Sequence, residues 1–74
     1  MLDDKALAVI NYGIRIYVKP VMRGGFRPNV KIIIEQNGIE QIGKIEYKQD
    51  EAWEKIEQLY ENIYLRLKND SLIP

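Results

Sequence analysis

The sequence predicts an α+β fold in which a three-stranded antiparallel β-meander, of order 1-2-3, carries one C-terminal α-helix on one face (βββα). Three observations predict it. Apolar and polar residues alternate from residue 8 to residue 19, an Asn-Gly dipeptide separates two apolar runs, and an apolar stripe at helical spacing follows them. At 74 residues the chain is long enough for one domain, residues 1–74, with a modest core.

The first strand is predicted from the alternation between residues 8 and 18. Six residues of one parity are apolar or aromatic: Ala8, Ile10, Tyr12, Ile14, Ile16 and Val18. A period of two is typical of a half-buried strand, which we expect from about Val9 onward. Residues 3–10 also fit a short helix capped by Asp3, and the sequence leaves this alternative open.

The second and third strands are predicted as a hairpin around Asn37-Gly38, a dipeptide that tolerates the two positive φ angles of a type I′ turn. A two-residue turn predicts these facing pairs: Gln36 and Ile39, Ile34 and Gln41, Ile33 and Ile42, Ile32 and Gly43, Lys31 and Lys44, Val30 and Ile45. One face should then be buried, through Val30, Ile32, Ile34, Ile39, Ile45 and Tyr47. Gly43 indicates either a notch on that face, filled by a large side chain such as Trp53, or a β-bulge.

The helix is predicted to begin at Asp50 and to end at Lys68, with Asn69 as its C-terminal cap. Asp50 and Glu51 fall in the first turn, where the positive end of the helix dipole favours acids. At about 100° per residue, eight residues lie within an arc of roughly 140° that should pack on the sheet. These are Ala52, Trp53, Ile56, Leu59, Tyr60, Ile63, Tyr64 and Leu67.

Composition argues against an enzyme. The chain has no Cys, no His and no Thr, and its only Ser is Ser71, so the side chains most used in acid–base and nucleophilic catalysis are missing. We therefore expect a non-enzymatic protein without a cofactor, a metal or a disulfide. The carboxylates of Glu54, Glu57 and Glu61 share one helix flank and could hold a hard cation, but such flanks are more commonly solvated surface.

The N-terminal residues predict the compartment. Residues 1–5 are acidic in balance, and the apolar run that follows them covers only residues 6–10. A secretory leader needs a basic start and a longer apolar run, and a membrane span needs about 20 apolar residues. We therefore expect a cytoplasmic protein with no membrane contact.

Charge is unevenly distributed, although 11 basic and 11 acidic residues balance overall. Residues 1–48 hold eight cations against five acids, a net charge of +3, and residues 49–74 hold three against six, a net charge of −3. The stretch from Lys19 to Lys31 has four cations, no acid and a Gly-Gly pair. With the outer sheet face it forms the first candidate partner-binding site: Arg15, Lys19, Arg23, Phe26, Arg27, Lys31, Lys44 and Lys48.

A second candidate partner-binding site follows one edge of the predicted helix, where aromatic residues adjoin acids. Its members are Trp53, Glu54, Glu57, Tyr60, Glu61 and Tyr64. Aromatic side chains beside charges are common at protein-binding surfaces. The same aromatic residues also fit a purely structural role in the core.

Together these features favour a small binding or regulatory module that acts through a protein partner. The small size and the Ile-, Lys- and Glu-rich composition suit an inhibitor or regulator encoded by a phage or another mobile element and directed at a host macromolecular complex. The alternative is a nucleic-acid-binding domain that uses the basic 19–31 loop and the outer sheet face. In the loop, Gly24-Gly25 lets amides approach a phosphate and Phe26 could stack on a base. A homodimer through an edge strand is also open, because the first strand is expected to outrun its neighbour.

Two architectural resemblances bear on the nucleic-acid alternative. The predicted fold resembles in outline the arm-binding domains of some phage integrases and the plant AP2-type domains, which read the DNA major groove with the outer sheet face. Here Glu35, Glu40 and Glu46 on that face would repel phosphates. If residues 3–10 are helical, the order αβββα is similar to that of double-stranded RNA-binding domains, whose last helix starts with a basic cluster where this chain has residues 49–53, Gln-Asp-Glu-Ala-Trp.

Overall fold

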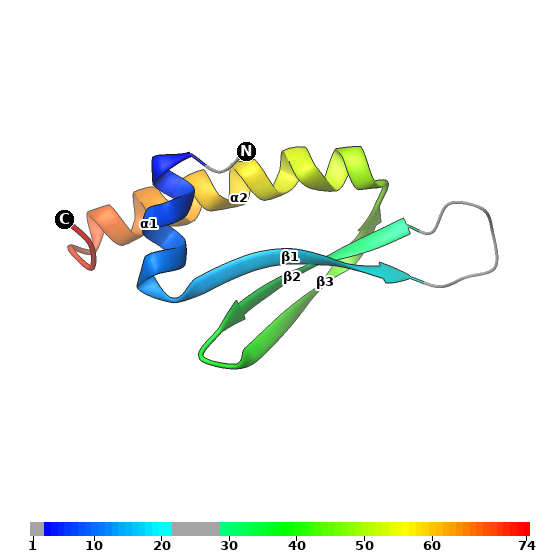
Figure 1. Ribbon diagram of the computed structural model, residues 1–74, viewed down its shortest axis with the longest axis horizontal. Helices are drawn as coiled ribbons and strands as arrows, with labels where there is room; N and C mark the ends of the chain where they lie inside the picture. The colour runs from blue at the N-terminus through cyan, green and yellow to red at the C-terminus, as the bar shows by residue number, and fades with distance from the viewer. Residues whose placement is uncertain (1–2, 22–28) are drawn as a thin grey trace.

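The computed structural model describes residues 3–21 and 29–74. Its elements are α1 (Asp4–Tyr12), β1 (Ile14–Val21), β2 (Asn29–Gln36), β3 (Ile39–Tyr47) and α2 (Gln49–Asn69). The strands form one antiparallel sheet of order β1-β2-β3, and both helices lie on the same side of it (Figure 1). The predicted α+β meander with a C-terminal helix is confirmed, and a short N-terminal helix is added to it.

Helix α1 corrects the expected start of the first strand. The prediction of a strand from Val9 is wrong, and the helical alternative for residues 3–10 is confirmed. Oδ1 of Asp3 accepts a hydrogen bond from the N–H of Ala6 at 2.8 Å and caps the helix. Gly13 ends it with a φ of 115°, a conformation that favours glycine. The strand can therefore begin only at Ile14, and the element order is αβββα.

The hairpin confirms the predicted turn. Asn37 and Gly38 have φ angles of 55° and 81°, as a type I′ turn requires. The three predicted pairs nearest the turn, up to Ile33 with Ile42, are also confirmed.

Beyond the Ile33–Ile42 pair, the predicted register of the hairpin is wrong. Lys31 faces Glu46 and Val30 faces Tyr47, because the register shifts between Lys31 and Ile33. The β-bulge reading of Gly43 is thus the correct one. A Cβ atom on Gly43 would lie 3.1 Å from the carbonyl oxygen of Ile32, so the close approach there is made by backbone and not by a helix side chain.

Helix α2 begins one residue before the predicted Asp50 and ends one residue after the predicted Lys68. Its buried residues are Ala52, Ile56, Tyr60 and Leu67. Trp53, placed in the buried arc by prediction, is instead 54% exposed. The side chain lies at about 100° from Ala52 around the helix, and therefore at the margin of the face that α2 turns toward the sheet.

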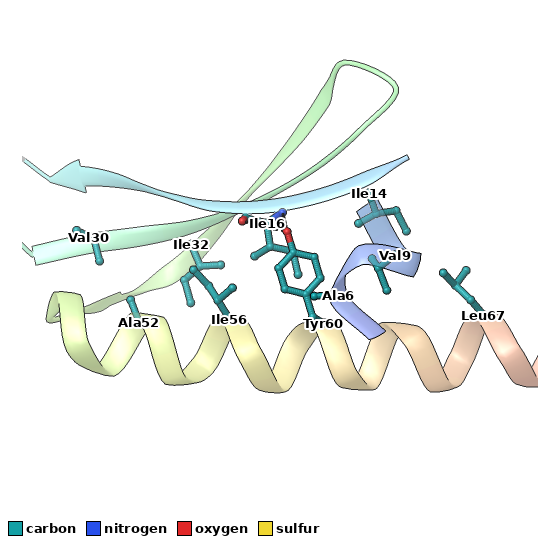
Figure 2. Packing of buried hydrophobic residues seen from close by; sticks show 10 residues of the cluster. All are labelled: Ala6, Val9, Ile14, Ile16, Val30, Ile32, Ala52, Ile56, Tyr60 and Leu67. Carbon is teal, nitrogen blue, oxygen red and sulfur yellow. Dashed lines mark hydrogen bonds between the residues drawn. The ribbon is translucent and has the colours of Figure 1, made fainter. Parts of the chain in front are cut away.

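The core lies between the helices and the first two strands (Figure 2). Val30 and Ile32 of β2 pack with Ala52 and Ile56 near the start of α2, whereas residues of α1 fill the space between β1 and the second half of α2. Helix α1 thereby gives the short chain a second layer of apolar contacts, which partly offsets the modest core expected for its length.

Tyr60 ties α2 to β1 in this core. Its ring is 5% exposed. Its hydroxyl oxygen accepts a hydrogen bond from the N–H of Ile16 at 2.9 Å, and the hydroxyl lies 3.4 Å from the Ile16 carbonyl oxygen, to which it donates (Figure 2). Both backbone groups of a buried residue are thus satisfied by one side chain.

Strand β3 lies largely outside the cover of the helices. Ile39 and Ile45, predicted to be buried, are 69% and 62% exposed. Helix α2 packs chiefly on β1 and β2, because a helix about 10 Å wide spans roughly two strands spaced about 4.8 Å apart. The tip of the β2–β3 hairpin also diverges from α2 (Figure 1).

Candidate protein-binding surfaces

The outer face of the sheet, opposite the helices, carries a network of ion pairs. Arg15 on β1 donates hydrogen bonds to the carboxylate of Glu35 on β2. Nζ of Lys19 lies 3.1 Å from Oε2 of Glu40 on β3, and Glu40 also accepts a hydrogen bond from the hydroxyl of Tyr17. Side chains of all three strands are joined in this way.

This network fixes the charge of its carboxylates. The hydrogen bond from Arg15 lowers the pKa of Glu35, and the hydrogen bonds from Lys19 and then Tyr17 lower the pKa of Glu40. Partial burial, followed by the bond to Glu40, raises the pKa of Tyr17. Both carboxylates therefore stay charged near neutral pH, and two of the predicted partner-binding cations are already neutralised by them.

Ile33 lies beneath the network and is 0% exposed, although it is on the face of the sheet that the helices do not cover. It is the β2 residue between Tyr17 on β1 and Ile42 on β3. Because the Lys19–Glu40 pair joins β1 to β3, it crosses β2 over this residue. A phosphate could reach Lys19 only in competition with Glu40, so this face is a poorer nucleic-acid surface than its count of cations indicates.

The predicted basic end is assembled only in part. Lys19 faces Lys31 across β1 and β2, but Lys31 faces Glu46 on β3. Lys44 was predicted to lie opposite Lys31. It lies instead in the shifted part of β3, and Lys31 faces Glu46. Cations of this end are therefore interleaved with acids.

The remaining members of the first candidate site are less defined. Lys48 is exposed and takes the N-cap position of α2, without a capping hydrogen bond from its side chain. Arg23, Phe26 and Arg27 lie outside the described residues, so their part in the site stays a prediction.

The second candidate site is brought together more fully. Five of its six members line a hollow of about 500 Å³ at the edge of α2, namely Trp53, Glu54, Glu57, Tyr60 and Glu61. Asp3, the N-cap of α1, and Ala6 of α1 close the other side of the hollow. Sequence reasoning missed this wall, because it depends on residues 4–12 being helical and packing against α2.

We call this feature the α1–α2 hollow. Its rim is acidic, and Lys5 neutralises part of it through a 3.2 Å contact between its Nζ and Oε1 of Glu61. Tyr60 forms the floor, since its ring is buried, whereas Trp53 is exposed at the mouth. Tyr64, the sixth predicted member, lies instead in a separate hollow with residues of α1 and Ile73.

The arrangement of the α1–α2 hollow suits a cationic side chain. An exposed indole attracts a Lys or Arg head group over its face, and carboxylates beside it add charge-assisted hydrogen bonds. Large aromatic side chains at a concave, partly apolar surface are also the residues that contribute most to protein–protein binding. The hollow can therefore accept an Arg or Lys side chain of a partner.

A third surface, along the helix side of β3, was not anticipated from the sequence. Ile39 and Ile45 are exposed on it, and Ile42 is exposed on the opposite, outer face of the same strand. Ile45 lines an open hollow with Leu59 of α2, and Ile39 lines another with Ile63. The signal was available in the widths of the elements, because one helix cannot cover three strands.

Within residues 3–21 and 29–74, the His, Cys, Asp and Glu side chains form no group of three or more that could hold a metal ion. In the same part of the chain, no helix is both long enough and apolar enough to cross a bilayer.

Comparisons with protein-family models, with curated proteins and with solved structures found no match for this chain. Its function therefore has to be argued from its surfaces alone.

Proposed function

We propose that the protein is a non-enzymatic binding module that engages a protein partner, and that the α1–α2 hollow is its main contact surface. The observation that carries the proposal is the exposure of Trp53. Its side chain is 54% exposed beside carboxylates, although the helical pattern of the sequence predicts it to be buried. Exposing the chain's single Trp costs apolar burial that a small domain needs. A bound partner would recover that burial.

The charge of the α1–α2 hollow supports a cationic segment of the partner as its occupant. Glu54 and Glu57 are exposed on its rim, and Asp3, the N-cap of α1, adds a carboxylate from the opposite side. An Arg or Lys placed between them would be desolvated on one side by Trp53 and paired on the other. Whether this partner belongs to a host complex that a mobile element inhibits stays a prediction.

Affinity capture with matched variants tests the proposal. The immobilised protein is incubated with a lysate of its source cells, beside Trp53→Ala and the control Leu65→Ala, which truncates an apolar side chain that is 50% exposed elsewhere on α2. We expect a protein that is retained by the parent and by L65A and lost with W53A. An identical set of retained proteins for all three would remove the α1–α2 hollow from the account.

The first candidate site is tested in the same capture by changing Arg23 and Arg27 together to Ala. Because these residues belong to the predicted basic loop, loss of the partner with R23A/R27A and not with W53A would move the contact from the hollow to the loop. We expect the opposite order of effects.

Nucleic-acid binding is the second candidate, and one observation favours it. The element order αβββα resembles in outline that of double-stranded RNA-binding domains. Against it, α2 begins with Gln49, Asp50 and Glu51 in place of a basic cluster, and Arg15 and Lys19 are paired with acids.

A salt titration separates the two candidates. Binding to generic duplex and single-stranded DNA and RNA is measured from low to physiological salt, because phosphate contacts give a steep dependence on salt. We expect no binding even at low ionic strength. Salt-sensitive binding that is lost with R23A/R27A would favour the nucleic-acid candidate.

A further inference from the structure

The two edges of the sheet differ in how accessible their backbone groups are. On β1, the N–H and C=O of Ile16 are both bonded to the hydroxyl of Tyr60. Pro20 lies four residues further along the strand, so it faces the same edge, and it has no N–H to donate. The expected overhang of the first strand is also wrong, since β1 pairs with β2 from Ile14–Gln36 to Val21–Asn29. Edge β1 is therefore partly closed to another strand.

On β3 the alternate backbone groups face outward. Gln36 and Ile39 flank the two-residue turn and pair with each other, and in such a hairpin the pairs that exchange backbone hydrogen bonds alternate with pairs that do not. Ile39 and Gln41 accordingly bond to β2, while Glu40 and Ile42 direct their N–H and C=O groups to the free edge. Up to Ile42, this edge is a template for an additional strand. The register shift that follows is by two residues, so Lys44 and Ile45 keep the side-chain parity of the rest of β3.

The sequence of β3 is complementary to itself. Around Ile42 as the centre, an antiparallel copy of the strand would place Glu40 opposite Lys44, Ile39 opposite Ile45 and Gln41 opposite Gly43. Charged residues on an edge strand normally discourage a second copy, because like charges meet. Here the two-fold arrangement makes them meet as opposite charges.

We propose that the protein forms a symmetric homodimer by antiparallel pairing of β3 with β3 of a second copy, centred on Ile42. The two sheets then continue as one six-stranded sheet with all helices on the same side. Such an isologous contact uses the same patch on both copies, as two-fold symmetry requires. The inference does not depend on the proposed function, since the α1–α2 hollow lies on the other flank of α2.

Apolar burial supplies the driving force in this arrangement. Ile39 and Ile45 are 69% and 62% exposed in the single chain. In the dimer, Ile39 of each copy would face Ile45 of the other copy on the helix side of the sheet. Ile42, 59% exposed, would meet its counterpart on the outer side. Three large side chains per copy that one chain leaves in water would thus lose part of their exposure.

Sedimentation analysis between about 10 µM and 1 mM tests the dimer. We expect a reversible monomer–dimer equilibrium for the parent. Ile42→Lys places two cations face to face at the two-fold axis and should weaken association at least tenfold. The control Leu65→Lys adds the same charge on α2 and should leave association unchanged. A parent that stays monomeric to 1 mM, or a dimer that I42K does not weaken, overturns the proposal and leaves the β3 edge to a strand of another protein.

Cross-linking tests the register independently of any loss of folding. The chain has no Cys, so I42C carries a single thiol. Facing residues of paired strands have Cα atoms about 5.5 Å apart, within the range of a disulfide. We expect I42C to form disulfide-linked dimers in a glutathione buffer in which L65C does not. Equal cross-linking of the two variants would overturn the proposed register.

The charge pair gives a third measurement. Lys44→Glu alone places acids opposite each other and should weaken the dimer, as should Glu40→Lys. A mixture of K44E and E40K should associate more tightly than either variant alone, because each pairing is then between opposite charges. No recovery in the mixture would contradict the pairing of Glu40 with Lys44.

Discussion

Replacing Tyr60 by Phe isolates the link between α2 and β1. The change keeps the ring, which is 5% exposed, and removes the hydroxyl that holds the N–H and C=O of Ile16. Ile16 is itself 7% exposed, so water cannot readily replace the lost partner. A buried donor left unpaired costs about 1–3 kcal/mol, and the second, longer bond adds a smaller loss. We therefore expect Y60F to lower the free energy of unfolding by about 2 kcal/mol.

Such a loss is large for this chain. A stability of roughly 0.05–0.15 kcal/mol per residue gives about 4–11 kcal/mol in total for its length, and about 2 kcal/mol corresponds to a fall of roughly 8–16 °C in Tm. Urea unfolding followed by circular dichroism measures the change, with Tyr64→Phe as the control, since the Tyr64 ring is half-buried and its hydroxyl can turn to water. Faster amide exchange at Ile16 should accompany it. A Y60F protein within about 0.5 kcal/mol of the parent would refute the reasoning.

Two further predictions concern the cap of α1 and the outer-face network. Asp3→Ala removes the carboxylate that accepts from Ala6 and should cost about 0.5–2 kcal/mol in urea unfolding, whereas Asp3→Asn keeps an acceptor and should cost less; equal losses would contradict a capping role. Because the folded-state pKa values of Glu35 and Glu40 lie below the usual value of 4.5, their stabilisation is present above that pH and is lost as the pH falls through the lowered values. The double variant E35Q/E40Q should therefore lose less unfolding free energy than the parent as the pH falls below about 4.5. An equal loss in both proteins would contradict the network.

The parts of the fold that could be predicted from the sequence are those set by local chemistry. Asn37-Gly38 fixed the turn and the pairs next to it, and the spacing of Ala52, Ile56 and Tyr60 placed α2 to within one residue at either end. Helix α1 was ambiguous, because residues 8–12 alternate like a strand. Asp3 before it and Gly13 after it were the decisive signals. Asp3 caps the start of the helix, and Gly13 adopts the positive φ that ends it.

The errors arise where packing at a distance decides. Which residues of β3 are buried depends on how many strands one helix covers, and this is why Ile39 and Ile45 are exposed against prediction. The register shift opposite Ile32 occurs where Gly43 approaches the Ile32 backbone, and the sequence offered a β-bulge there as only one of two readings. For the candidate sites, the sequence placed Trp53 beside its neighbouring acids, and the structure shows that these residues line one hollow, but the second wall of the α1–α2 hollow could not be foreseen without α1.

The emission of Trp53 on binding the captured partner tests the central claim most directly. It is the only Trp in the chain, so a titration with a partner from which tryptophan is absent or replaced reports on this residue alone. The account predicts a shift of the emission to shorter wavelength that saturates with binding, because the indole passes from water into a contact surface, and affinity that weakens with added salt. Saturable binding that leaves the emission of Trp53 unchanged would contradict it.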